Sequence, residues 1–195
     1  MTQVTKKTEV LEDPPIARFL FNGTTMAWVW LIARLYLGYM WIDAALHKVN
    51  DPSWVQTGLA LKGFWLRAVA IPKPPARPPI SFPWYREFLQ YMLDIQAYTW
   101  FGKLVAYGEL LIGIALVLGV LTGFAAFFGA FMNFNFMLAG TASTNPVLFL
   151  IAILLILAWK TAGYVGVDRY LLPLLGTPWQ PGRIFGPRAA PEVTS

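Results

Sequence analysis

Long apolar runs constrain this chain more than any other feature of its sequence. Four segments consist almost entirely of apolar and aromatic residues: 24–47, 101–121, 124–140 and 146–162. The first two exceed the roughly 20 residues that an α-helix needs to cross a bilayer, and the short turn at Thr122-Gly123 makes the third run antiparallel beside the second. The sequence therefore predicts an all-α integral membrane protein, a four-helix bundle in which each helix crosses the membrane.

Composition supports a membrane location and narrows the chemistry. Hydrophobic residues make up 57% of the chain and charged residues 13%, against about 45–50% and about 25% in soluble domains. This excludes a disordered chain, a nucleic-acid-binding module and a secreted disulfide scaffold. With no cysteine and one histidine, the chain lacks ligands for a thiolate metal site, an iron–sulfur cluster or a bis-histidine haem. We therefore expect no metal and no haem, and any redox chemistry must use a bound organic cofactor or a partner subunit.

Polar segments flank and divide the apolar runs. Residues 1–23 are predicted to form a polar N-terminal tail, 24–172 the four-span domain, and 173–195 a Pro/Gly-rich C-terminal tail. The insertion 49–100 is predicted to hold short interfacial helices, with Asp51 as an N-cap, and an extended proline-rich strap between the first and second spans. Four spans put both termini on one side. We expect a multi-pass protein of the cell (plasma) membrane with cytoplasmic termini, although Lys and Arg are divided evenly between the two sides.

A polar face runs along the first apolar segment. Tyr36, Asp43 and His47 recur at helical spacing and share one side of the helix. A carboxylate one turn from an imidazole can orient it, and this pair beside a phenol suits a site that binds a membrane quinone and moves its protons. Asp43 and His47 are thus candidate catalytic residues, and all three are candidate quinone contacts. The alternative is that Asp43 and His47 only end the helix at the level of the headgroups.

Two further charged residues lie inside the apolar segments. Arg34 is near the middle of the first span, facing away from Asp43, and Glu109 is well inside the second. Because a charge in a bilayer costs about 2.5–3.5 kcal/mol, we expect the two to pair. The pair would either fix helix register or set the charge beside a quinone, with Arg34 binding the cofactor and Glu109 catalytic. Asn133 and Asn135 point about 200° apart, and one is expected to bond across helices.

Basic residues collect in and beside the insertion. Lys48, Lys62 and Arg67 have few acidic residues near them in the sequence and are candidate substrate-binding residues. A small oxyanion substrate and the headgroup of an anionic lipid are both suitable partners, and the sequence leaves this choice open. The expected partners are the lipid bilayer and other protein subunits, and not nucleic acid.

Two stretches resemble the DoxX family of four-span membrane proteins. They are ARLYLGYMWIDAALHKVNDPSWV (33–55) and LVAYGELLIGIALVLGVLTGFAAFFGAFMNFNFMLAGTASTNP (104–146). The most distinctive parts are GELLIG (108–113), LTGF (121–124) and MNFNFMLAGTAS (132–143). Over about residues 25–172 the chain is also similar to the DoxD-like small subunit of thiosulfate:quinone oxidoreductase.

The resemblance implies a membrane subunit that helps to oxidise thiosulfate to tetrathionate while a membrane quinone is reduced. It matches an arginine of the family's first span to Arg34 and a glutamate of its second span to Glu109. On this hypothesis thiosulfate approaches through the basic loop. The alternative, from a different class, is a non-catalytic membrane anchor or assembly subunit of a larger respiratory or photosynthetic complex. A small transporter fits less well, because the four spans show no inverted repeat or broken helix.

Overall fold

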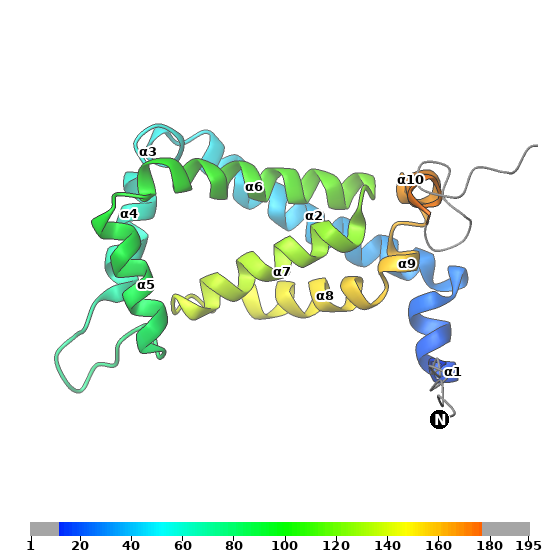
Figure 1. Ribbon diagram of the computed structural model, residues 1–195, viewed down its shortest axis with the longest axis horizontal. Helices are drawn as coiled ribbons and strands as arrows, with labels where there is room; N and C mark the ends of the chain where they lie inside the picture. Colours follow the sequence, from blue (N-terminus) through cyan, green and yellow to red (C-terminus); the bar gives the residue numbers. More distant parts are fainter. Residues whose placement is uncertain (1–11, 177–195) are drawn as a thin grey trace, which may run out of the picture.

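Four long helices build the body of the protein. The computed structural model describes residues 12–176, and within that range every regular element is helical. The long helices are α2 (Ala27–Val49), α6 (Tyr98–Leu118), α7 (Thr122–Leu138) and α8 (Asn145–Leu157), packed together as Figure 1 shows. Their facing sides share one hydrophobic core, which includes the fully buried Leu37, Leu116 and Leu155. The all-α prediction is confirmed for the described residues.

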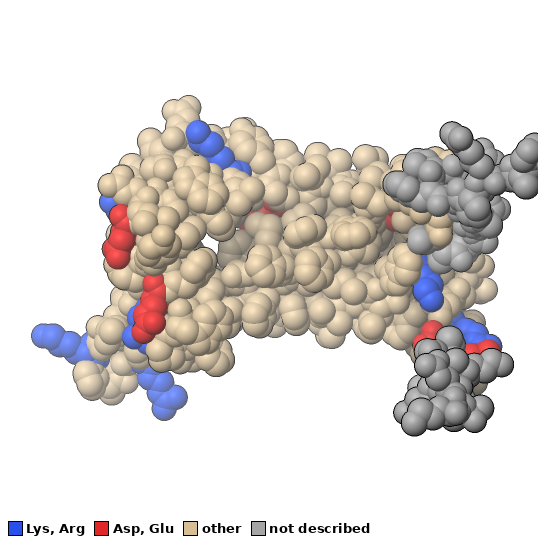
Figure 2. Space-filling model, viewed as in Figure 1, with Lys and Arg blue, Asp and Glu red and all other residues tan. Residues whose placement is uncertain are grey.

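Two of the four helices are long and apolar enough to cross a membrane. They are the segments Thr24–Val49 and Tyr98–Leu118, and 33% and 39% of the most apolar 18-residue stretch of each are buried in the protein. α7 and α8 are shorter, with 17 and 13 residues. On the face shown in Figure 2, charged side chains gather at the two ends of the molecule, and the surface between them is almost free of charge. The crossing of the bilayer by all four helices stays a prediction.

α2 and α6 bring their backbones into close contact at two glycines. A Cβ atom on Gly113 would lie 2.9 Å from the main-chain oxygen of Gly38 and 2.9 Å from the main-chain nitrogen of Ile42. A Cβ atom on Gly38 would lie 3.0 Å from the main-chain oxygen of Gly113. Small residues permit this approach, and van der Waals packing then holds membrane helices together. The contact sets the antiparallel register of the two helices, with Gly38 opposite Gly113.

Gly113→Ala is expected to destabilise the α2–α6 pair. The added methyl group meets main-chain atoms that cannot rotate away, and overpacking of this kind costs about 1–3 kcal/mol. Thermal unfolding in detergent, followed by tryptophan fluorescence, should therefore begin at a lower temperature. Gly108→Ala is the matched control on the same helix, because a Cβ atom there meets nothing within 4 Å. If the two variants lowered the unfolding temperature by the same amount, the close-contact explanation would be contradicted.

A layer of short helices lies across one end of the bundle. It contains α3 (Pro52–Val55), α4 (Leu59–Val69) and α5 (Pro83–Asp94), with the non-helical, proline-rich segment 70–82 between α4 and α5 (Figure 1). Asp51 caps α3, as predicted, by accepting a hydrogen bond 2.8 Å long from a main-chain N–H of the first turn. α4 and α5 share a second hydrophobic core. The structure thus has the short helices and the strap that the sequence predicted for the insertion.

The first and last described helices lie at the opposite end of the bundle. Before α2 come α1 (Pro15–Ala17), the π-helix η1 (Arg18–Asn22) and the 3-10 helix η2 (Thr24–Met26), where the sequence predicted a polar tail up to residue 23. This segment packs on the bundle, and the Thr161 hydroxyl donates to the main-chain oxygen of Phe21 at 2.8 Å. After α8 follow α9 (Trp159–Ala162) and α10 (Asp168–Leu175), and α10 and α1 lie at the same end (Figure 1). The tail predicted from residue 173 starts inside α10, and residues 177–195 lie outside the described part.

Candidate functional site

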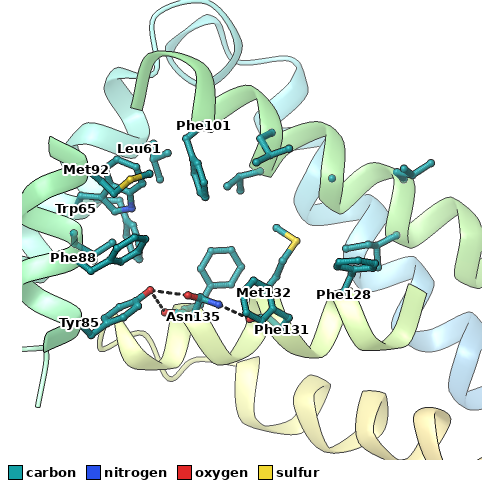
Figure 3. Close-up of a pocket in the computed structure, with 18 residues that line it drawn as sticks. Leu61, Trp65, Tyr85, Phe88, Met92, Phe101, Phe128, Phe131, Met132 and Asn135 are labelled. Carbon is teal, nitrogen blue, oxygen red and sulfur yellow. Dashed lines mark hydrogen bonds between the residues drawn. The ribbon is translucent and has the colours of Figure 1, made fainter. Parts of the chain in front are cut away.

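An aromatic cavity lies between the bundle and the layer of short helices. Its volume is about 590 Å³, within the roughly 300–1,000 Å³ typical of small-molecule sites. α4 and α5 form one wall, and α6 and α7 form the other (Figure 3). Its aromatic lining residues are Phe64, Trp65, Tyr85, Phe88, Phe101, Phe128, Phe131 and Phe136. Most of the others are aliphatic, so the cavity suits a flat apolar ring or a hydrocarbon chain.

The cavity is open along the outer side of the bundle. Leu104 and Leu111 of α6 and Phe128 and Phe131 of α7 line it, and each of these side chains is more than half exposed. Gly108 forms part of the same wall, with open space where a side chain would lie. In a bilayer this side faces acyl chains. A lipid-soluble molecule therefore has a sideways route into the cavity.

One pair of polar side chains interrupts the apolar lining. The Tyr85 hydroxyl lies 3.1 Å from both the main-chain oxygen and Oδ1 of Asn135, and Asn135 Nδ2 donates to the main-chain oxygen of Phe131 at 2.8 Å (Figure 3). This bond between α5 and α7 confirms the interhelical contact predicted for one of the two asparagines. Asn133 is fully buried in the bundle, and neither of its side-chain polar atoms has a hydrogen-bond partner among residues 12–176. The Asn135 amide keeps a second N–H that can bind a carbonyl oxygen of a ligand.

The Tyr85 hydroxyl is expected to resist ionisation. Burial raises the pKa of Tyr85 to about 12, because apolar surroundings disfavour the phenolate. An unfolded chain loses this proton near pH 10, so the stability that Tyr85 contributes is complete below about pH 10 and is lost as the pH rises toward about 12. In an ultraviolet titration of phenolate formation, Tyr85→Phe should remove a component near pH 12. Tyr91→Phe, at an exposed position of the same helix, should leave it in place. A component near pH 12 that survives Tyr85→Phe would contradict the assignment.

The predicted polar face of α2 does not line the cavity. Tyr36, Asp43 and His47 do share one face of the helix, but that face is exposed and lies outside the hydrophobic core. The imidazole of His47 is oriented through Nδ1, which lies 2.8 Å from the main-chain oxygen of Asp43. The sequence suggested the Asp43 carboxylate for this role. The structure therefore keeps the three residues together and separates them from the cavity.

The predicted pairing of Arg34 with Glu109 is wrong. Glu109 is 1% exposed and accepts a hydrogen bond 2.7 Å long from Lys48 Nζ. Arg34, also 1% exposed, donates from Nη2 to the main-chain oxygen of Val165 at 2.7 Å. The register of the two helices explains the difference. The Arg34 guanidinium lies directly against Gly119, where a Cβ atom would collide with it. Arg34 thus lies at the end of α6, about 15 Å along the helix from Glu109.

A residue that the sequence analysis did not single out organises this end of the bundle. Asp168 is fully buried at the start of α10 and accepts hydrogen bonds from the main-chain N–H groups of Leu121 at 2.6 Å and Thr122 at 2.8 Å. It thereby caps the first turn of α7, and its negative charge attracts the Arg34 guanidinium. The capped turn lies 46 residues earlier in the chain, so only the tertiary fold reveals the contact. The one local signal is an acidic residue between a glycine-containing turn and an apolar helix.

The three basic residues predicted to bind an anion have separate environments. Lys48 is held in the ion pair with Glu109, and the Lys62 ammonium lies 5.1 Å from the centroid of the Tyr98 ring. Arg67 is exposed on α4. Lys48 therefore serves the packing of the bundle, and Lys62 and Arg67 remain as candidate anion contacts.

The two membrane-length apolar helices define a membrane-type helical protein, and the aromatic cavity lies beside one of them. The DoxX family profile matches residues 29–142, which extend from the first turn of α2 to the end of α7 and include every residue that lines the cavity. The chain belongs to the DoxX family. No curated protein and no solved structure matches it.

Proposed function

We propose that this protein is a four-span membrane subunit of a quinone-linked oxidoreductase and that it binds a membrane quinone in the aromatic cavity. The observation that carries the proposal is the cavity itself, which is about 590 Å³ in volume and lined by aromatic and aliphatic side chains. Membrane quinones are flat rings with long apolar tails and reach their sites through the bilayer. An aromatic site that opens toward lipid suits both the ring and its route of entry.

The residues of the cavity offer what such a ring needs. Trp65 and Phe101, with ring centroids 5.6 Å apart, provide aromatic surface, and the apolar walls exclude water. The second N–H of the Asn135 amide can donate a hydrogen bond to a carbonyl oxygen at one end, and Tyr85 holds that amide in place by donating to it. A bound quinone supplies the chemistry, which is the acceptance of two electrons and two protons. In this proposal the chain binds and orients the ring.

The narrower form of the proposal follows the resemblance to the DoxD-like subunit of thiosulfate:quinone oxidoreductase. Two thiosulfate ions would join through a new S–S bond to give tetrathionate, and the two electrons released, with two protons, would convert quinone to quinol. Lys62 and Arg67 are the basic residues that would attract the anion. Asp43 and His47 lie on the exposed face of α2 and in this proposal do not contact a quinone in the cavity.

Filling the cavity from the α6 wall tests the proposal. Gly108→Leu places an isobutyl group in the cavity, and quinone extracted from the purified protein and measured by mass spectrometry should fall about tenfold, the effect of ~1.4 kcal/mol. Gly108→Ala is the matched control, because it adds one methyl group to open space and should retain the quinone. Unchanged quinone in a folded Gly108→Leu variant would contradict the proposal.

The second candidate is a non-catalytic anchor or assembly subunit. It is favoured by the hydrogen bond between Tyr85 and Asn135, which already pairs the two polar side chains of the cavity with each other. A cavity with its polar groups paired is equally suited to the acyl chain of a structural lipid. Phospholipid recovered without quinone from the parent protein, and lost in Gly108→Leu, would select this candidate.

A further inference from the structure

The proline-rich strap between α4 and α5 (residues 70–82) carries two positive charges and no negative charge. Lys73 and Arg77 are both exposed, and neither side chain makes a hydrogen bond or an ion pair within the described part of the chain. The exposed acids of the same layer, Glu87 and Asp94, lie on α5 and pair with neither of them. Figure 2 shows Lys and Arg side chains projecting outward at this end of the molecule. The strap thus presents cations that await a negatively charged partner.

The strap is fixed on its inner side. Ile80 is 1% exposed and belongs to the hydrophobic core that α4 and α5 share. The main chain of Pro79 touches the turn between α7 and α8, because a Cβ atom on Gly140 would lie 2.7 Å from the Pro79 oxygen. The five prolines of the strap restrict the rest of its backbone. The two cations are therefore held on the outer side of a segment that is already anchored, and a ligand does not have to order it.

Large apolar side chains lie beside the two cations in the sequence. Ile71 near the start of the strap is 70% exposed, Phe82 at its end is 50% exposed, and Trp84 in the first turn of α5 is 59% exposed. Tryptophan and basic residues together are typical of segments that lie where lipid headgroups meet acyl chains. An acidic protein surface would satisfy the cations alone, whereas a lipid also covers the apolar side chains.

The layer of short helices lies at the level of the headgroups when α6 crosses a bilayer. The 21 residues of α6 measure about 31 Å, close to the thickness of the hydrocarbon core. α6 begins only three residues after α5 ends, so α5 lies beside one boundary of that core. In Figure 1 α4 and α5 lie across the direction of the long helices, and the strap extends from them away from the bundle. The strap therefore reaches the region of neighbouring lipid headgroups.

We propose that the strap binds the phosphate groups of anionic phospholipids at this membrane surface. The Arg77 guanidinium can donate two parallel hydrogen bonds to one phosphate, and the Lys73 ammonium adds a second positive charge. Ile71, Phe82 and Trp84 pack against the glycerol groups and the first methylenes of the same lipids. This inference rests on the membrane-length helices and not on what the cavity binds.

A label on the strap reports the lipid contact, and the absence of cysteine makes an introduced thiol unique. Ala76→Cys lies between the two cations at an exposed position and can carry an environment-sensitive fluorophore. With the full chain in phosphatidylcholine nanodiscs, emission should shift to shorter wavelength as phosphatidylglycerol is added, and high salt should reverse the shift by screening the charges. Inorganic phosphate should leave the emission unchanged. No shift with phosphatidylglycerol, or a shift of the same size with inorganic phosphate, would overturn the proposal.

A charge-matched pair of variants assigns the contact to the strap. In the Ala76→Cys background, Lys73→Gln/Arg77→Gln should weaken the binding of phosphatidylglycerol about thirtyfold, the effect of ~2 kcal/mol for two basic residues, so the shift should disappear. Arg18→Gln/Arg169→Gln removes the same net charge at exposed positions of the opposite end and should keep the shift. Thermal unfolding checks that both variants keep the parent fold. A shift that persists in the strap variant, or that disappears in both variants, would overturn the proposal.

Discussion

Asp168→Ala is expected to destabilise the end of the bundle where α6, α7 and α10 meet. The carboxylate accepts main-chain hydrogen bonds from Leu121 and Thr122 and lies 0% exposed, near a guanidinium of Arg34 that is 1% exposed. Its removal leaves two main-chain N–H groups without their acceptor and takes away the negative charge that favours the buried guanidinium. A buried donor left without a partner costs about 1–3 kcal/mol, so we expect a loss of about 2–6 kcal/mol, which lowers the unfolding midpoint by roughly 10 °C in a protein of this size. Thermal unfolding followed by circular dichroism in detergent measures the shift.

Two further variants show which part of the Asp168 contact matters. Asp168→Asn keeps an oxygen that can accept one of the two hydrogen bonds but removes the negative charge, so we expect an intermediate loss. Asp94→Asn is the matched control, because this exposed carboxylate in α5 only accepts from Gln90 at 2.9 Å. The free energy of unfolding of Asp94→Asn should differ from that of the parent by no more than about 0.5 kcal/mol. An Asp168→Ala protein as stable as the control would show that the buried carboxylate does not hold this end together.

Local sequence patterns were enough to predict the helical elements. The first three apolar runs correspond to α2, α6 and α7, and the fourth, predicted as one helix over 146–162, is divided between α8 and α9. The Asn50-Asp51-Pro52 signal correctly marks the start of α3, since a cap needs only neighbouring residues. The shared face of Tyr36, Asp43 and His47 also follows from helical spacing alone.

Contacts between elements could not be predicted in the same way. Arg34 and Glu109 were expected to pair because both are charged and lie in neighbouring spans, but the glycine contact between α2 and α6 sets them at different levels. Lys48, one residue beyond the predicted first span, instead reaches Glu109 from the end of α2 with its long side chain.

The candidate site was missed for the same reason. Its walls come from four helices, two of them in the insertion, and phenylalanines on lipid-facing helices are common enough that none marks a cavity by itself. Asp168 acts on a turn far away in the sequence. What separates Asn135 from Asn133 is the position of Tyr85, which the sequence does not give.

Lys48→Met is expected to destabilise the protein more than Glu109→Gln, although the two residues form one ion pair. Without the ammonium, the Glu109 carboxylate is left 1% exposed among apolar helices, and an uncompensated buried charge costs about 3–5 kcal/mol. The Lys48 side chain is 20% exposed. When the carboxylate is removed, its ammonium still donates to the main-chain oxygen of Ala44 at 3.3 Å and lies 5.5 Å from the centroid of the Trp54 ring. A lysine can also extend its ammonium toward water. We therefore expect Glu109→Gln to cost about 1 kcal/mol.

The double variant Lys48→Met/Glu109→Gln decides whether the pair acts as a unit. With both charges gone, no buried charge lacks a partner, and such replacements are often neutral or stabilising, so stability should return close to that of the parent. The two single losses sum to about 4–6 kcal/mol and would then fail to add by about that amount, more than the 0.5–3 kcal/mol common for residues in direct contact. Lys62→Met controls for the loss of a lysine whose ammonium lies over the Tyr98 ring and has no ion pair within the described part of the chain, and should have a small effect. Additive losses in the double variant would contradict the pairing, because they would mean that Lys48 stabilises the bundle without Glu109.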